Sequence, residues 1–208
     1  MIAREFWAQL ESWLDEHEPS MKALIRPAAT EAEIAAVENA TGYTFPSELR
    51  ASYLLHDGCE ANSGLLCGIG LMSLEAMTTN WEMWAEIGRD DDESLNESCS
   101  SVPPDAVQVK YANATWLPFA GDSQHYVAID FAPGPAGRVG QVISSGRDDE
   151  IRHVIGATVG DFFSFVIKHL KSGKVCIAPA EIGDVPRYLC IGDSHDLLTA
   201  LPELLTVK

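Results

Sequence analysis

The sequence predicts an α+β fold in a single domain covering residues 1–208. Helical periodicity occupies both ends of the chain and β-rich segments lie between them, whereas an α/β fold would alternate the two. The connections between the β-rich segments are short, which favours hairpins and a mainly antiparallel sheet with helices packed around it. A chain of 208 residues with 46% hydrophobic residues fits one globular domain with a sizeable core.

Six segments carry the signals of helices. They are residues 3–17, 30–42, 46–57, a segment that begins at Ser73, residues 159–171 and residues 194–200. Thr30 and Glu33 have the spacing of a capping box, and Gly42 supplies a left-handed stop. Thr158 and Asp161 form an acidic capping pair before the fifth segment.

Four β-rich segments follow the fourth helix, at residues 116–120, 126–131, 139–143 and 151–155. Pro118 predicts an edge or bulge position in the first of them. Two shorter segments, residues 64–67 and 188–191, are predicted to extend the sheet. Residues 89–98 contain little to bury, so we expect an exposed, mobile acidic loop there.

The net charge of −17 indicates the class of partner. Such a surface repels a phosphate backbone, so nucleic-acid binding is not expected, whereas it attracts a basic protein and speeds the encounter with it. The acidity alternatively serves solubility alone. No apolar run approaches the roughly 20 residues of a membrane helix, and the N-terminus lacks a signal-peptide core, so we expect no membrane contact and a cytoplasmic protein.

Cysteine and histidine spacing predicts no metal, no cofactor and no disulfide framework. The five cysteines are odd in number and scattered, with no Cys-x-x-Cys pair, so free thiols in a reducing cytosol are expected. The six histidines show no paired ligand spacing. The run from Asp90 to Glu93 resembles the start of a calcium loop but lacks its glycine and its final glutamate.

One enzymatic alternative rests on short matches. Residues 121–123 and 192–194 both read Gly-Asp-Ser, the nucleophile block of one class of serine esterases, and Asp122 and His125 have the spacing of that class's acid and base. In those esterases the serine block comes early in the domain and the histidine late, which is not the order here. The sequence therefore predicts no enzyme, and a hydrolase that uses Asp122, Ser123, His125 or Ser194 remains only a remote alternative.

Trp81 and Trp84 lie three residues apart and therefore on adjoining parts of one helical face. The usual role of such a pair is core packing. The acidic residues 90–93 nearby allow a second interpretation, in which one indole borders a groove for a protein partner.

An ordered set of fragments resembles a known family. The fragments are residues 30–38, 41–50, 54–58, 116–122, 127–130, 140–143 and 161–163. In this order they are similar to the SUKH superfamily, which contains the yeast cell wall assembly regulator and many bacterial relatives. The resemblance covers about residues 28–171, so residues 1–27 form an N-terminal helical extension and residues 172–208 a C-terminal extension. Phe45-Pro46 stands where Leu-Pro is commoner in the family.

The resemblance implies helices around a curved sheet and no catalytic residues. Bacterial members are immunity proteins that bind toxins, often nucleases, and the yeast member is a scaffold in cell wall signalling. We therefore expect an immunity-type protein that binds and neutralises a basic toxin, with a regulatory scaffold as the alternative. The candidate partner-binding residues are Asp57, Glu60, Trp84, Asp90, Asp91, Asp92, Glu93 and Asp122.

Overall fold

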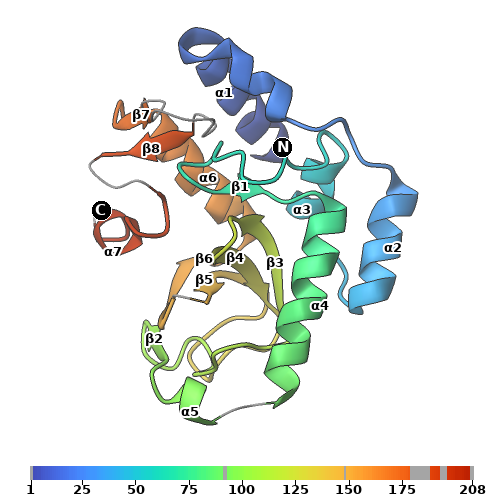
Figure 1. The fold of residues 1–208 in the computed structure, drawn as a ribbon, viewed down its shortest axis with the longest axis vertical. Coiled ribbons are helices and arrows are strands. Elements are labelled where there is room, and N and C mark those ends of the chain that lie inside the picture. Colours follow the sequence, from blue (N-terminus) through green and yellow to red (C-terminus); the bar gives the residue numbers. More distant parts are fainter. Residues whose placement is uncertain (1, 91–92, 148, 179–187, 193–195, 207–208) are drawn as a thin grey trace.

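The computed structural model describes residues 2–90, 93–147, 149–178, 188–192 and 196–206. A mixed six-stranded sheet lies among the helices, and a second, two-stranded sheet lies near the C-terminus (Figure 1). The predicted α+β class is therefore confirmed. The helices are α1 Ile2–His17, the 3-10 helix η1 Pro19–Leu24, α2 Glu31–Thr41, α3 Ser47–Tyr53, α4 Leu74–Asp90, α5 Glu93–Asn96, α6 Val159–Leu170 and α7 Leu201–Leu204.

The helix boundaries follow the predicted capping signals closely. The Glu33 backbone N–H donates to Thr30 Oγ1 (3.2 Å) and the Thr30 N–H donates to Glu33 Oε2 (2.7 Å), which is the predicted capping box. Gly42 ends α2 in the left-handed conformation, with φ of 78°. The prediction of a helix over residues 194–200 is wrong where it is described, because residues 197–200 form turns and α7 begins at Leu201. Residues 193–195 lie outside the described residues.

The central sheet has the strand order β1-β3-β4-β5-β6-β2. Its strands are β1 Gly70–Leu71, β2 Ser100–Val102, β3 Trp116–Gly121, β4 His125–Asp130, β5 Gln141–Gly146 and β6 Ile151–Gly156. Strands β3 to β6 form the predicted antiparallel meander, and the register of β3 shifts between Pro118 and Ala120, as expected for a bulge at the proline. Strand β2 pairs in parallel with β6, which the sequence did not predict.

Two strand predictions need correction. Residues 64–67 form no strand, because Gly64 and Cys67 both have positive φ and the chain turns there; β1 is the edge strand instead. Residues 189–191 do form a strand, β8 Leu189–Ile191. It pairs with β7 Val175–Ile177 in a separate sheet rather than extending the central one.

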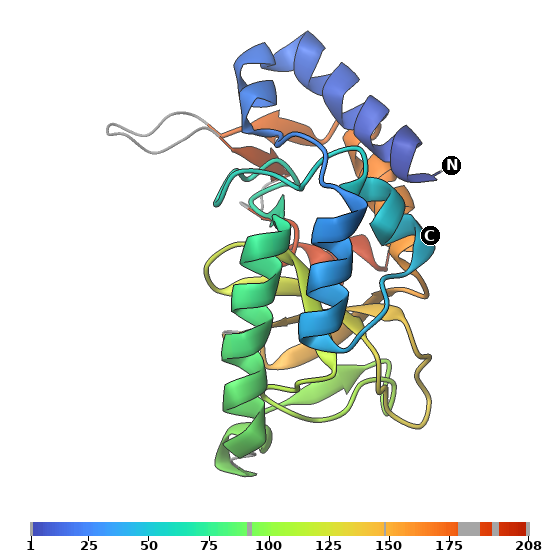
Figure 2. The same cartoon turned by 90° about the vertical axis from the view of Figure 1, so that its right-hand side faces the viewer.

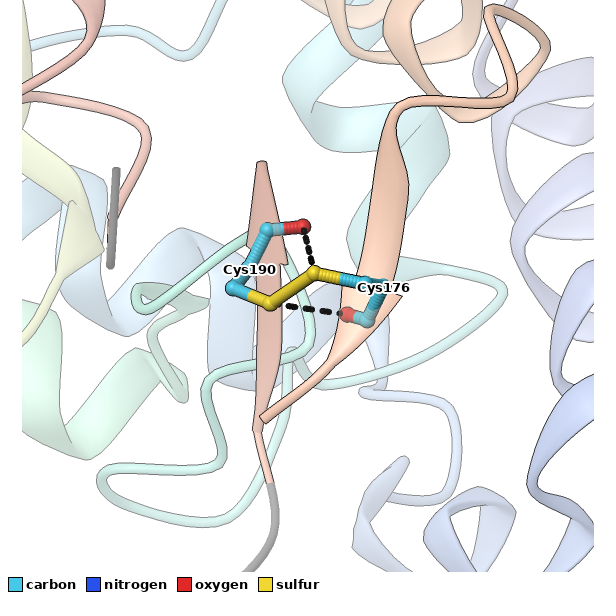
Figure 3. Close-up of a disulfide and its surroundings, with 2 residues drawn as sticks. All are labelled: Cys176 and Cys190. Carbon is cyan, nitrogen blue, oxygen red and sulfur yellow. Dashed lines mark hydrogen bonds between the residues drawn. A yellow bond between two sulfur atoms is a disulfide. The ribbon is translucent and has the colours of Figure 1, made fainter. Parts of the chain in front are cut away.

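The expectation of free cysteines is wrong for two of the five. Cys176 of β7 and Cys190 of β8 lie opposite each other and form a disulfide, with their Cα atoms 5.2 Å apart. Figure 3 shows the bond between the two strands. Cys59, Cys67 and Cys99 are free and buried. Strand pairing between residues 14 positions apart produced this bond, and cysteine spacing alone does not reveal it.

The acidic segment is helical where a loop was expected. Asp90 is the last residue of α4 and Glu93 the first of α5, while Asp91 and Asp92 lie outside the described residues. Asp90 and Glu93 are exposed, as predicted. The segment is tied down by buried Cys99 and by the Tyr111 backbone N–H, which donates to Asn96 Oδ1 (2.7 Å).

The main core lies between α6, the central sheet and α1. Phe6 of α1 stacks on Phe163 of α6 with ring centroids 4.5 Å apart, and Phe162 of α6 meets Phe119 of β3 edge to face at 5.4 Å. All four rings are fully buried, which is worth about 1.5–3 kcal/mol for each side chain. Helices α2 and α4 run side by side (Figure 2). Residues 82, 83, 86, 87, 89 and 90 of α4 are exposed, so part of this helix faces solvent.

Candidate protein-binding site

A cleft lies where the N-terminal half of α4 meets the edge of the central sheet. In Figure 1 this is the region where the upper end of α4 stands beside β1 and β3. The cleft has a volume of about 420 Å³. Its lining residues are Arg26, Cys59, Glu60, Ala61, Asn62, Gly70, Leu71, Met72, Ser73, Glu75, Ala76, Thr79, Asn80, Gly121 and Asp122.

Two glycines keep the inner wall of the cleft free of side chains. Gly70 of β1 lies directly opposite Gly121 of β3. A Cβ built on Gly70 would lie 2.5 Å from Ser63 Oγ, and one built on Gly121 would overlap the backbone oxygen of His125. Gly121 therefore requires glycine for space, whereas at Gly70 a larger residue would require the Ser63 hydroxyl to turn away.

Carboxylates dominate the rim of the cleft. Glu60, Glu75 and Asp122 line it from three separate elements, and Glu60 and Glu75 are exposed. The cation in the lining, Arg26, is already paired, because its Nη1 lies 3.1 Å from Glu60 Oε1 and its Nε lies 3.2 Å from Asp57 Oδ2. The rim thus retains negative charge that a basic group of a partner would neutralise.

Asp57 lies behind the rim and holds the start of α4 in place. Its Oδ2 accepts from Arg26, and its Oδ1 accepts from the backbone N–H of Leu74 at 2.8 Å, which satisfies one of the free donors at the start of α4. The hydrogen bond to Asp57 is the main reason why the pKa of Arg26 is raised. Asp57 lines a neighbouring cleft of about 300 Å³ that shares Arg26, Glu75 and the first turns of α4 with the main one.

Asp122 closes a tight turn after β3. Its Oδ1 accepts from the backbone N–H groups of Gln124 (2.6 Å) and His125 (2.8 Å), and its Oδ2 lies 3.4 Å from His125 Nδ1. The predicted polar turn at residues 121–123 is therefore present. The His125 ring contacts Asp122. Among the described residues, no hydrogen bond joins that ring to Ser123, which is exposed. Asp193 and Ser194 of the second match lie outside the described residues.

Trp84 does not line the cleft. Its ring lies 5.7 Å from the ring of Tyr111 and 5.8 Å from that of Tyr126, and it is partly buried against the core. Trp81 is partly buried too, and its indole N–H donates to the backbone oxygen of Ala114 (2.9 Å). Both tryptophans pack against the core, as the first of the two interpretations expects, and Trp84 also adjoins the exposed face of α4 because it lies three residues from Ile87.

One face of α4 continues the cleft as an exposed stripe that sequence reasoning missed. Ala76 and Asn80 line the cleft, and Met83 and Ile87 follow at helical spacing. Met83 is 45% exposed and Ile87 36%, so α4 presents two large apolar side chains to solvent one turn apart. Asp90 ends the same stripe. We call Ala76, Thr79, Asn80, Met83, Ile87 and Asp90 the α4 stripe.

The predicted site residues therefore fall into separate groups. Glu60 and Asp122 meet in the cleft and Asp57 supports it from behind. Asp90 lies at the far end of the α4 stripe, close in sequence to Glu93. The missed residues Met83 and Ile87 had a signal in the sequence, since positions 76, 80, 83 and 87 recur at helical spacing on one face of the helix.

The remaining chemistry is sparse in the described part of the chain. There, no group of three or more histidine, cysteine or acidic side chains is arranged to hold a metal ion. Nor does any described helix have the length and hydropathy needed to cross a membrane.

The fold and the cleft define an α+β domain with an acid-rimmed cleft beside the edge of its sheet. The chain belongs to the SMI1/KNR4 family (SUKH-1), whose family model matches residues 28–164. The predicted membership of the SUKH superfamily is therefore confirmed.

Several named proteins are similar to this chain. The cell wall biosynthesis/cell cycle regulator smi1 of Schizosaccharomyces pombe is 31% identical, over 82% of this chain and 36% of its own length. The cell wall assembly regulator SMI1 of Saccharomyces cerevisiae is 27% identical, over 81% and 40%. Human F-box only protein 3 is 25% identical, over 98% of this chain and 43% of its own length. The chain thus spans less than half the length of these relatives.

Proposed function

We propose that this chain is a non-catalytic, protein-binding regulatory domain of the cell wall assembly regulator type, and that it binds a basic segment of its partner. The observation that carries the proposal is the carboxylate-rimmed cleft and its continuation along the α4 stripe. The names of the fungal relatives support the regulatory role.

Charge and shape together define the segment that fits. The cleft offers Glu60, Glu75 and Asp122, and the stripe adds Met83 and Ile87. A segment with lysines or arginines and a few apolar residues complements both features, since charge steers association and apolar contact prolongs it. Helix α4 has 17 residues and is about 25 Å long, so a partner helix of similar length would follow it.

The regulatory role is preferred over the neutralisation of a toxin. Both need an acidic binding surface, so the cleft alone does not separate them. The two fungal relatives are named as regulators of cell wall assembly or biosynthesis, and the comparisons give the toxin hypothesis no support. The hydrolase alternative gains nothing either, because His125 is held by Asp122 rather than by a serine among the described residues.

A domain exchange in fission yeast tests the proposal. The segment of the S. pombe regulator that matches this chain is replaced by residues 1–208, since the chain corresponds to only 36% of that protein. The chimera is expected to restore resistance to wall-degrading enzymes in cells that lack the regulator. The cleft variant Glu60→Gln/Glu75→Gln is expected to lose that rescue.

A control variant matches the change in charge. Glu5→Gln/Glu203→Gln removes two exposed carboxylates outside the cleft, and Glu5 lies in the first turn of α1 as Glu75 does in α4. This variant is expected to rescue fully. A chimera that accumulates normally without restoring resistance, or a cleft variant that rescues as well as its control, would refute the proposal.

A further inference from the structure

The Cys176–Cys190 disulfide joins a hairpin whose strand β8 contacts the segment of residues 63–69 at Gly64. The two neighbours of that segment, Asn62 and Gly70, both line the cleft. The contact is direct, because the Leu189 backbone N–H donates to the backbone oxygen of Gly64 at 3.0 Å. Tyr188 packs so closely on Gly64 that no Cβ fits there.

We propose that Cys176 and Cys190 form a reversible redox pair, and that the oxidised pair fixes residues 63–69 and with them the adjoining wall of the cleft. The proposal has two halves. The structural half, that the disulfide fixes residues 63–69, is independent of any partner. The functional half, that this affects binding, rests on the cleft proposed above as the binding site.

The fold accommodates both redox states. When the disulfide is reduced, each thiol has an acceptor at hand, because Cys190 Sγ lies 3.3 Å from the Cys176 oxygen and Cys176 Sγ lies 3.8 Å from the Cys190 oxygen. The dashed lines of Figure 3 mark these two contacts. Each cysteine therefore keeps a polar partner after the S–S bond is broken.

The pair is also chemically selective. Cys176 is exposed, so an incoming thiolate reaches its sulfur, while Cys190 is only 8% exposed. The free cysteines are buried, and burial raises the pKa of Cys59 and of Cys67 to about 12, which leaves them almost entirely as unreactive thiols at neutral pH. A mild oxidant or reductant therefore acts on the disulfide pair first.

The exchange involves two electrons and a small thiol such as glutathione. One thiolate attacks Cys176 Sγ, forms a mixed disulfide and releases the Cys190 thiolate, which takes up a proton. A second thiolate attacks the glutathione sulfur, releases the Cys176 thiolate and leaves as part of glutathione disulfide. Two thiols are thus oxidised and the protein disulfide is reduced, and glutathione disulfide drives the reverse reaction.

Reduction is expected to loosen the wall because the hairpin is small. Strands β7 and β8 have three residues each, and a two-stranded ribbon of this size is marginal by itself. The disulfide limits how far β8 separates from β7, and so keeps Leu189 against Gly64. Without the disulfide, residues 63–69 retain the hydrogen bond from the Leu197 N–H to Cys67 O (2.6 Å), but β8 is no longer held firmly against Gly64.

Amide hydrogen exchange of the full chain, before and after reduction by dithiothreitol, tests the structural half. The amides of Leu66 and Leu189 are expected to exchange at least tenfold faster in the reduced protein, while those of α6 stay unchanged. Mass spectrometry of the air-oxidised protein is expected to show two hydrogens fewer than in the reduced form. Equal exchange at Leu66 in both forms, or the absence of the disulfide after oxidation, would overturn the proposal.

Variants separate the disulfide from other effects of the reductant. Cys176→Ser/Cys190→Ser is expected to exchange like the reduced protein and to ignore dithiothreitol, whereas Cys99→Ser is expected to respond as the wild type does. Because the wild type is measured in both states, a poorly folded variant does not block the test. If Cys99→Ser abolishes the response instead, the pair assigned here is wrong.

The functional half is measured with a synthetic peptide of about 16 residues, with lysine and leucine at helical spacing to match the length of α4. Its affinity is expected to be several-fold lower for the reduced protein. Equal affinity for both forms would show that the redox pair does not act on the cleft. If the peptide binds neither form, the proposed function fails, whereas the exchange of Leu66 still decides the structural half.

Discussion

Asp57 accepts a hydrogen bond from the backbone N–H of Leu74 (2.8 Å) while its other oxygen pairs with Arg26. One carboxylate thereby joins the start of α4 to the chain that enters from η1. The Asp57 side chain is 19% exposed, so its hydrogen bond to Leu74 is largely sheltered from water, whereas Arg26 is 34% exposed and their ion pair is partly solvated. Removal of this side chain therefore affects the position of the helix that carries the cleft.

Asp57→Ala is expected to lower the free energy of unfolding by about 2 kcal/mol, since it removes a helix cap and leaves Arg26 without its main partner. Asp57→Asn keeps the acceptor for Leu74 and is expected to lose less than half as much. Urea denaturation of both variants measures the difference. Equal losses in the two variants would show that the charge, and not the cap, is what matters.

Gly121→Ala is expected to destabilise the protein by roughly 1–3 kcal/mol, because the new Cβ overlaps the backbone oxygen of His125 and the β3–β4 turn has to shift. Gly160→Ala is the matched control. There the nearest atoms lie 3.5 Å from the new Cβ and the residue is helical, so stability is expected to stay level or rise slightly. Thermal unfolding of both variants makes the comparison, and a Gly121→Ala protein as stable as the wild type would contradict it.

The elements that were predicted correctly are those with local causes. The Thr30–Glu33 capping box needs only four consecutive residues, and the bulge at Pro118 follows from one missing N–H. Strand β2 had no such signal. Its three residues read Ser-Ser-Val, and pairing with β6 alone makes them a strand.

The candidate site depended on contacts that are distant in sequence. Glu60 and Asp122 were both predicted as acidic partner-binding residues, but the antiparallel pairing of Gly70 with Gly121 is what brings their segments together. The pairing of Cys176 with Cys190 is likewise a product of the β7–β8 register. Sequence spacing does not encode such tertiary relationships, so the residue types were predictable and their grouping was not.

Asp149 is expected to make stability depend on pH. Burial raises its pKa to about 6, against 3.8 for an ordinary aspartate; His125 and Arg152 lower it, and Asp196 and Asp122 raise it further. The folded protein therefore binds a proton between these values that the unfolded chain releases. Its contribution to stability is present at low pH and is lost as the pH rises through about 6.

Asp149→Asn has no carboxyl group to ionise, so it avoids the stability lost when buried Asp149 becomes charged. The variant is expected to gain on the order of 2 kcal/mol more stability at about pH 8 than at about pH 4. Burial lowers the pKa of His153 and His169, which act in the opposite sense, so wild type and variant are compared at each pH. Glu150→Gln, at an exposed neighbour, serves as the control. A stability gain of equal size at both pH values would contradict the predicted role of Asp149.

The α4 stripe is expected to contribute to binding without contributing much to folding. Met83→Gln/Ile87→Gln replaces two exposed apolar side chains by a good helix former, so the free energy of unfolding is expected to change by less than about 0.5 kcal/mol. Affinity for the lysine/leucine peptide is expected to fall about tenfold, because apolar contacts set the lifetime of such complexes.

Leu54→Gln/Val139→Gln is the matched control for this prediction, since Leu54 is 38% and Val139 65% exposed and neither lies on α4. Fluorescence anisotropy of the labelled peptide measures both variants at low and at physiological salt. Purely electrostatic binding would weaken with salt equally in both variants and the wild type. Contact with the stripe instead predicts that the wild type keeps part of its affinity at physiological salt while the α4 variant loses it. Equal affinities for the two variants would remove Met83 and Ile87 from the binding surface.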